Sequence, residues 1–109
     1  MFDITQQDVI ALVDSYVDSF DPLVFREIPA KEKRKYIILC MVIHYFKKDV
    51  LYSEQEVNQI LKPKLTDHVM IRRYLVDYGF LERTENGSSY WLVKDPKDYL
   101  MYRIDNYKK

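Results

Sequence analysis

The sequence DHVMIRRYLVDYGFLERTENGSSYWLV, residues 67 to 93, decides the fold. Its first half carries apolar residues at helical spacing, and its second half has the β-prone composition of a hairpin around an asparagine-glycine pair. These patterns predict a helix over 67–78, a stop at Gly79, where a left-handed residue often ends a helix, and a hairpin over 80–93.

The hairpin prediction depends on its turn. Asn86 and Gly87 form the two-residue sequence that favours a type I′ turn, in which both central residues need a positive φ. Pairing outward from such a turn sets Arg83 opposite Tyr90 and places Leu81 on the same face of the hairpin.

The chain before this stretch predicts two helices. TQQDVIALVDSYVDSF carries an apolar stripe and an acidic opposite face, so we expect an amphipathic helix over about 5–20 that stops at Asp21-Pro22. IPAKEKRKYIILCMVIHYFKKD begins a second helix after Pro29. That helix is apolar nearly all round over 36–46, which indicates the central helix of the domain.

A short strand and a short helix are expected between the central helix and residue 67. Residues 50–52, VLY, are β-prone. Ser53 and Glu56 have the spacing of a capping box, which stabilises a helix start by about 1 kcal/mol. Pro63 ends this helix, and Asp67 is expected to cap the next one.

A last helix is predicted after the hairpin, over about 97–108. Asp95 is its expected cap, with Pro96 at the first helical position. Leu100 and Ile104 share an apolar stripe that is expected to cover the second face of the hairpin.

Helix, short strand, helix, helix and hairpin follow one another in the order of a winged helix-turn-helix. The predicted fold class is mainly α with a small β-hairpin (α+β), with one extra N-terminal and one extra C-terminal helix. A chain of 109 residues supports one hydrophobic core. We therefore expect a single domain over 1–109 with its winged-helix core at about 25–93.

Composition narrows the class of protein further. The formal net charge is zero, yet residues 1–25 contain five aspartates and no lysine or arginine, so the rest of the chain is basic. One cysteine rules out an internal disulfide framework. The start of the sequence lacks a basic leader, and the longest apolar run is too short to span a bilayer, so the expectation is a cytoplasmic protein without membrane partners.

Three segments resemble a bacterial family of unknown function, number twenty eighty-seven in the domain-of-unknown-function series. They are YSEQEVNQIL (52–61), DHVMIRRYLVDYGFLER (67–83) and GSSYW (87–91), within a resemblance over roughly 25–93. The resemblance implies a winged-helix fold and frequent attachment to transcription-regulator domains, without an established activity. The positions that match are Glu56, Val57, Asn58, Asp67, Arg72, Arg73, Leu75, Val76, Asp77, Gly79, Arg83 and Tyr90.

The outward face of the predicted third helix is the first candidate site. It carries Val69, Arg72, Arg73 and Val76, which mix two cations with aliphatic surface. In one interpretation the arginines contact phosphates or guanine edges and a valine contacts a thymine methyl group. In the other, they form weak pairs with nearby acids such as Asp77 on a solvated face.

Other residues with suitable charge extend this candidate DNA surface. They lie at the start of the central helix, around the turn of the helix-turn-helix, in the first turn of the third helix and after the hairpin: Lys31, Lys33, Arg34, Lys35, Lys62, Lys64, His68 and Lys94. The first four resemble an anion site at a helix start. The alternative is that Glu27 and Glu32 neutralise part of that run.

Catalytic chemistry finds no support in the sequence. No glycine-rich phosphate loop, metal motif or activated nucleophile is present, so neither an enzyme nor a cofactor is expected. Cys40 and His44 are one helical turn apart, but two side chains are too few for a zinc site, and core packing is the favoured role. Trp91 is expected to be structural.

Two functions follow as hypotheses. In the first, the chain is a DNA-binding protein and candidate transcriptional regulator, with 67–78 in the major groove and the hairpin 80–93 as the wing, its tip at 84–89. In the second, it is a protein-interaction or dimerisation module with a winged-helix shape and no nucleic-acid binding. Both hypotheses allow a homodimer through the outer helices, and the sequence identifies no small-molecule effector.

Overall fold

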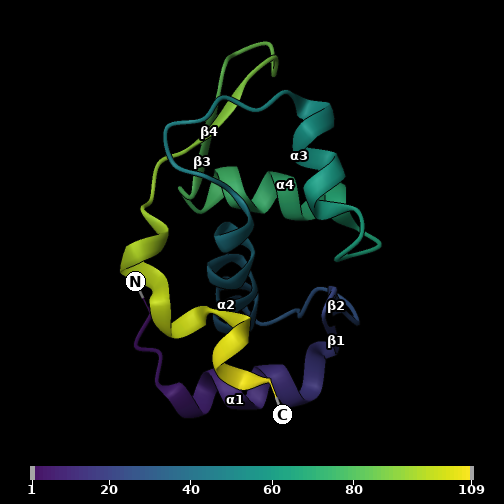
Figure 1. The fold of residues 1–109 in the computed structure, drawn as a ribbon, viewed down its shortest axis with the longest axis vertical. Helices are drawn as coiled ribbons and strands as arrows, with labels where there is room; N and C mark the ends of the chain where they lie inside the picture. Colours follow the sequence, from purple (N-terminus) through teal and green to yellow (C-terminus); the bar gives the residue numbers. More distant parts are fainter. Residues whose placement is uncertain (1, 109) are drawn as a thin grey trace.

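The computed structural model describes residues 2–108 and has the predicted α+β class. Helix α2 stands in the centre, with α1 crossing at one end, α4 at the other, and the C-terminal segment alongside (Figure 1). In chain order the elements are α1 (Gln6–Tyr16), β1 (Val17–Phe20), β2 (Leu23–Phe25), α2 (Glu32–Val42), the 3-10 helix η1 (Ile43–Tyr45), α3 (Glu54–Leu61), α4 (His68–Asp77), β3 (Leu81–Arg83), β4 (Tyr90–Leu92), and the 3-10 helices η2 (Pro96–Tyr102) and η3 (Ile104–Tyr107).

Helix α2 forms the middle of the core, as its all-round apolar pattern predicts. Every residue from Ile37 to Ile43 is at most 1% exposed. Val9 of α1 and Leu75 of α4 are also buried completely in the same cluster. Burial of such aliphatic side chains contributes roughly 1.5–3 kcal/mol each, so the core around α2 fixes where α4 lies.

The sequence signals for the ends of α3 and α4 are confirmed, except for one N-terminal cap. Ser53 and Glu56 form both hydrogen bonds of the capping box. Gly79 follows α4 with a φ of +80°, a conformation that favours glycine. Asp67 occupies the position before α4, but its side chain makes no capping hydrogen bond, so that prediction is wrong. Its backbone, at φ −92° and ψ 57°, is outside the extended region typical of a cap.

The β3–β4 hairpin has the predicted register, with Arg83 opposite Tyr90, but a different turn. The Gly87 amide donates to the Thr84 carbonyl at 2.9 Å, and Gly87 alone in this turn has a positive φ. The type I′ prediction, which requires a positive φ at Asn86 as well, is therefore wrong. The Thr84 hydroxyl instead accepts from the two serine amides that follow Gly87, which stabilises a longer loop.

The predicted strand over 50–52 is reduced to a single bridge beside the hairpin. The Tyr52 amide donates to the Tyr90 carbonyl at 2.8 Å, and the Tyr90 amide donates back to Tyr52 at 2.8 Å. This bridge joins the start of α3 to β4. The element order expected for residues 30–93 is therefore present.

The first helix is shorter than predicted. It ends at Tyr16 rather than near residue 20, because Val17–Phe20 form β1 and pair with β2. A distant contact supports this hairpin: the Phe25 amide donates to the Lys64 carbonyl at 2.8 Å. The prediction of a helix over 5–20 is thus wrong at its end, where backbone pairing satisfies groups that further helical turns would also have satisfied.

The C-terminal helix predicted over 97–108 is also corrected. Asp95 caps the segment and Pro96 begins it, as predicted, but the chain forms two 3-10 helices separated by Arg103, whose backbone is extended. Leu100 is 55% exposed, whereas Ile104 is buried. The expected cover of the hairpin is limited: Tyr99 packs its ring 5.6 Å from that of Phe80, next to β3, and the segment otherwise follows α2.

Candidate functional site

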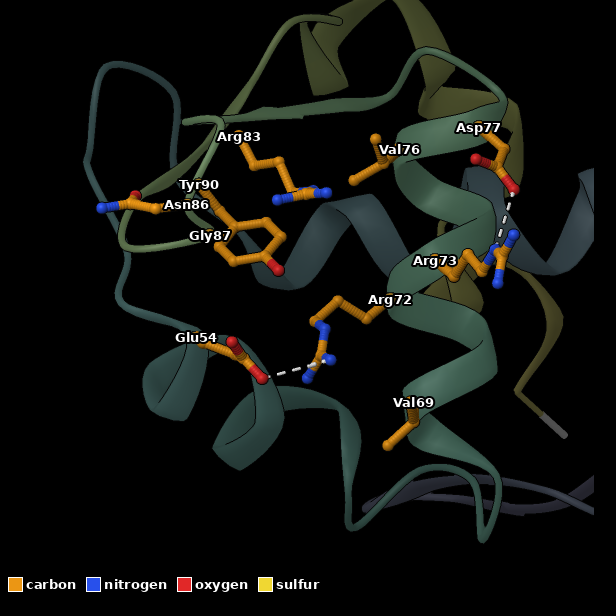
Figure 2. A pocket seen from close by; sticks show the side chains of 10 residues that line it. All are labelled: Glu54, Val69, Arg72, Arg73, Val76, Asp77, Arg83, Asn86, Gly87 and Tyr90. Atoms are coloured by element: carbon orange, nitrogen blue, oxygen red, sulfur yellow. Dashed lines mark ion pairs between the residues drawn. The ribbon is translucent and has the colours of Figure 1, made fainter.

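An open groove of about 620 Å³ lies between α4, the start of α3 and the β3–β4 hairpin. Figure 2 shows its side chains arranged around one space, with α4 on one side and the hairpin loop on the other. The residues that line it are Glu54, Val69, Arg72, Arg73, Val76, Asp77, Arg83, Asn86, Gly87 and Tyr90. We call this the α4 groove.

The outward face of α4 forms one wall of the groove. All four residues predicted for that face, Val69, Arg72, Arg73 and Val76, line it. They face away from the core because α4 turns its other side, with Leu75, toward α2. Val69 is 49% exposed, so the wall offers aliphatic surface as well as charge.

Arg72 is held in place by α3. Its guanidinium lies 3.2 Å from a carboxylate oxygen of Glu54 and donates a hydrogen bond to the side-chain oxygen of Asn58. The Arg72 side chain is only 16% exposed, whereas that of Glu54 is 49% exposed. Two partners on a neighbouring helix therefore orient Arg72, and one of them offsets its charge.

Arg73 is much more accessible. Its side chain is 74% exposed and lies 3.7 Å from Asp77, one turn further along α4. An exposed pair of this kind typically contributes about 0.3–0.5 kcal/mol. A phosphate could therefore replace Asp77 as the partner of Arg73 at little cost.

Arg83 brings a third guanidinium to the groove from β3. Its Nη1 donates to the carbonyls of Thr84 and Glu85 at 3.2 and 3.1 Å, and it has no carboxylate partner within residues 2–108. Gly87 lies next to this guanidinium, where an added Cβ would be 3.4 Å from Nη1, an ordinary van der Waals contact. The Arg83 side chain points from the hairpin into the groove (Figure 2).

Sequence reasoning did not select Arg83 as a site residue. The register of the hairpin was the available signal, because it sets Arg83 opposite Tyr90. Tyr90 is only 4% exposed, and its hydroxyl points toward the space between Arg72 and Arg83 (Figure 2). Glu54 and Asn58 were also missed as site residues, since only packing of α3 against α4 brings them to Arg72.

The basic run at the start of α2 does not line the groove. Lys33 forms an ion pair with Asp8 of α1 at 3.0 Å. Lys35 is 9% exposed, with its ammonium 4.3 Å from the ring centroid of Tyr74 and 3.7 Å from Glu32. The predicted pairing with Glu32 is therefore present, and two of the four cations serve contacts within the chain.

The remaining candidate contacts lie outside the groove as well. Four of them are exposed: Lys31, Arg34, Lys62 and Lys94. Lys64 is turned inward, where its ammonium donates to the Ile60 carbonyl at 2.7 Å and lies 4.1 Å from the ring centroid of Tyr45. Partial burial lowers the pKa of Lys64. His68 is half-buried, and its Nδ1 has no hydrogen-bond partner among the described residues.

Cys40 and His44 occupy positions that fit the predicted packing role. Cys40 is a buried free thiol, and burial raises its pKa to about 12. His44 Nε2 lies 2.7 Å from the Tyr99 carbonyl, and burial lowers the pKa of His44. Within residues 2–108, no three side chains of His, Cys, Asp or Glu gather in a way that would hold a metal ion.

Two properties of the described chain complete this picture. Helices long and apolar enough to cross a membrane are absent from residues 2–108. No curated protein and no solved structure shows detectable similarity to the chain. One family does match: the bacterial family described as "Uncharacterized protein conserved in bacteria (DUF2087)" covers residues 24–92. The match spans β2 to β4, including every residue of the α4 groove, and the chain belongs to this family.

Proposed function

We propose that the chain is a winged-helix DNA-binding protein and a candidate transcriptional regulator. In this proposal α4 enters the major groove, and the loop at 84–89 acts as the wing beside it. The observation that carries the proposal is the convergence of three guanidinium groups, from α4 and from the hairpin, on one open groove. The order of α2, the Tyr52 bridge, α3, α4 and the hairpin supports the proposal, because it matches the order expected of a winged helix-turn-helix.

The three arginines have different roles in this proposal. Arg73 and Arg83 contact phosphates, because Arg73 is highly exposed and Arg83 has no acidic partner in the described chain. Arg72, oriented by Asn58 and Glu54, is suited to a bidentate contact with a guanine edge. Val69, at the start of α4, offers aliphatic surface for a thymine methyl group.

The acids in the groove limit how tightly DNA binds. Glu54 and Asp77 offset two of the three positive charges, so each phosphate competes with a carboxylate already present. We therefore expect modest affinity that decreases as salt is raised. Discrimination between sequences would rest on Arg72, whose position α3 fixes before DNA arrives.

Binding to a mixed-sequence DNA duplex, followed by fluorescence anisotropy as salt is varied, tests the proposal. The two phosphate contacts, from Arg73 and Arg83, give a slope of log affinity against log salt of about −1.8, since each contributes roughly −0.9. Arg73→Gln and Arg83→Gln should each reduce its magnitude by about 0.9.

The matched control is Arg26→Gln. Arg26 is exposed and pairs with Asp18 at 3.1 Å, and it does not line the α4 groove. The β1–β2 hairpin lies beside the turn between α3 and α4 (Figure 1). Its replacement should leave the slope unchanged. Absence of binding at low salt, or a slope that the groove variants do not alter, would contradict DNA binding.

A second function, a protein-interaction or dimerisation module, is favoured by the same acids. Glu54 and Asp77 break up the positive surface of the groove, and Val69 is 49% exposed at its edge. In this case Val69→Glu should weaken self-association without altering the fold. Sedimentation equilibrium at tens of micromolar measures self-association of the parent chain and of this variant. If both are monomers, self-association is excluded at these concentrations.

The proposed homodimer through the outer helices meets one structural constraint. Val9 and Leu12 of α1 and Ile104 of η3 pack inside the same chain, so they are not available to a partner. A dimer through these elements would use surface that remains exposed, such as Leu100. The sedimentation experiment measures this directly, with Leu100→Glu as the variant expected to shift the equilibrium toward monomer.

A further inference from the structure

A second pocket, of about 520 Å³, lies along the C-terminal segment. It is bounded by the end of β1, by η1, and by η2 and η3, and none of its lining residues belongs to the α4 groove. The C-terminal segment runs beside α2 toward α1, at the end of the molecule opposite the β3–β4 hairpin (Figure 1). We call it the C-terminal pocket.

Uncovered apolar side chains gather in this pocket. Tyr45 is 38% exposed and Leu100 is 55% exposed, although both are large and hydrophobic. Ile104 and Phe20 extend the apolar wall toward the core. The Lys64 ammonium lies 4.1 Å from the ring centroid of Tyr45, which helps to fix that ring. A ligand with an apolar body would remove this surface from water.

Positive charge is in excess around the pocket. The Asp105 carboxylate serves two cations at once, Arg103 at 3.2 Å and Lys108 at 3.0 Å. Asp21, 89% exposed at its side chain, lies 3.9 Å from Lys108. Lys97 also lines the pocket, and its side-chain ammonium has no acidic partner within residues 2–108. Three cations therefore face two carboxylates, so one positive charge is not balanced and could pair with an anionic ligand.

His44 adds a hydrogen-bond acceptor. Its Nε2 lies 2.7 Å from the Tyr99 carbonyl, and because a carbonyl can only accept, Nε2 must carry the proton. Burial lowers the pKa of His44, the hydrogen bond to the Tyr99 carbonyl opposes this shift, and the charge of Arg103 lowers the pKa further, so the net effect favours the neutral ring. Nδ1 is then an acceptor on a side chain that lines the pocket.

We propose that the C-terminal pocket binds a small organic acid with an aromatic or branched aliphatic body. The carboxylate of this ligand accepts hydrogen bonds from Arg103 and Lys97, and its body lies on Tyr45 and Leu100. The volume is within the range of about 300–1,000 Å³ that is usual for small-molecule sites. The proposal is independent of DNA binding at the α4 groove.

Titration of the ¹⁵N-labelled full chain at constant ionic strength tests this site. The probes are 4-hydroxyphenylacetate, indole-3-acetate and isovalerate, each compared with its uncharged primary amide. At least one acid should give saturable shifts of the backbone amide signals, confined mainly to residues 20–21, 43–45 and 96–108. That acid should bind about tenfold more tightly than its amide, since the amide lacks the charge-assisted contact.

Two variants on exposed side chains locate the binding. Arg103→Gln should weaken the best acid about tenfold and bring it close to its amide. Leu100→Gln should weaken the acid and the amide alike, because both lose apolar contact. Lys48→Gln, an exposed lysine outside the pocket, is the matched control and should change neither.

The proposal would be overturned by any of three results. One is that none of the three acids gives saturable shifts below about 10 mM, the weak end of specific binding. Another is that acids and amides bind equally. The third is that Arg103→Gln and Leu100→Gln leave the affinity unchanged while the folded amide spectrum is retained.

Discussion

Two regions of the molecule concentrate positive charge: the basic run 31–35 at the start of α2 and the arginines of the α4 groove. Their side chains lie in different surroundings. In the first region, Lys33 contacts Asp8 and Lys35 is buried against Tyr74. In the second, Arg73 and Arg83 come from separate elements and line one open space. A candidate interface is therefore marked by the convergence of charges from several elements rather than by their number in the sequence.

The difference follows from where the two helices lie. Helix α2 is central, so part of its first turn faces α4, and the Lys35 stem packs there while its ammonium reaches the Tyr74 ring. Helix α4 has only one side on the core. Its other side is open beside the hairpin, where solvent keeps long cationic side chains accessible.

The strongest test of the comparison removes two groove charges together. Arg73→Gln with Arg83→Gln should lower DNA affinity near 0.1 M salt by about a hundredfold, because each phosphate contact contributes roughly tenfold there. Anisotropy titration measures it. Lys31→Gln with Arg34→Gln removes two exposed cations from the first region and should have little effect on DNA affinity. Equal losses of affinity in the two double variants would show that the two regions do not differ in DNA binding.

The next effect is on stability. Lys35→Ala should lower the free energy of unfolding by about 1–2 kcal/mol, because the buried stem and the ammonium contact with Tyr74 are lost. Urea unfolding monitored by circular dichroism gives the value. Arg34→Ala, at an exposed position in the same turn, should change it by less than about 0.5 kcal/mol. Similar losses for both would mean that Lys35 behaves as a surface residue.

A smaller loss is expected where α3 holds Arg72. Arg72→Ala should lower the free energy of unfolding by about 1 kcal/mol, since Asn58 and Glu54 lose their shared partner. Arg73→Ala should be nearly neutral because its pair with Asp77 is exposed. A double-mutant cycle of Arg72 with Asn58 isolates their contact, and zero coupling would show that Arg72 is not oriented by α3.

The smallest effect concerns the first region and its dependence on pH. The pKa of Asp8 is lowered first by the Thr5 backbone amide and then by Lys33. Because the folded pKa lies below the unfolded one, the resulting stabilisation is present above the ordinary aspartate pKa of 3.8 and is lost as pH falls through the folded pKa. Urea unfolding between about pH 5 and pH 2 should therefore show a shallower decline for Asp8→Asn than for the parent chain. Lys33→Gln should make the decline shallower by a smaller amount, because the Thr5 contact remains. If stability declines as steeply in Asp8→Asn as in the parent chain, Asp8 does not contribute to the pH dependence.

Sequence patterns located the elements around the groove well because their causes are local. The Ser53 capping box and the stop at Gly79 depend on residues within one turn of the helix end. The hairpin register depends on alternation about a short loop. The outward face of α4 follows from helical geometry once its inward stripe is known. The wall of the groove that α4 forms was therefore predictable.

The rest of the groove depends on contacts between elements. Arg83 reaches the groove because the hairpin lies beside α4, and Glu54 reaches Arg72 because α3 packs against α4. The cations at 31–35 looked equally promising in the sequence, where nothing distinguishes a buried lysine from an exposed one. Only the packing of α4 over the start of α2 made that distinction.

By itself, the sequence determined the α+β class, the apolar central helix and the boundaries of α3 and α4, because hydrophobic periodicity and helix caps act over a few residues. The tertiary structure decided that residues 17–20 form a strand, that the C-terminal segment breaks into two 3-10 helices, and which arginines share a groove. In marginal segments, several backbone conformations have similar local free energies. Distant partners, such as the Lys64 carbonyl that accepts from Phe25, then select the one that is formed.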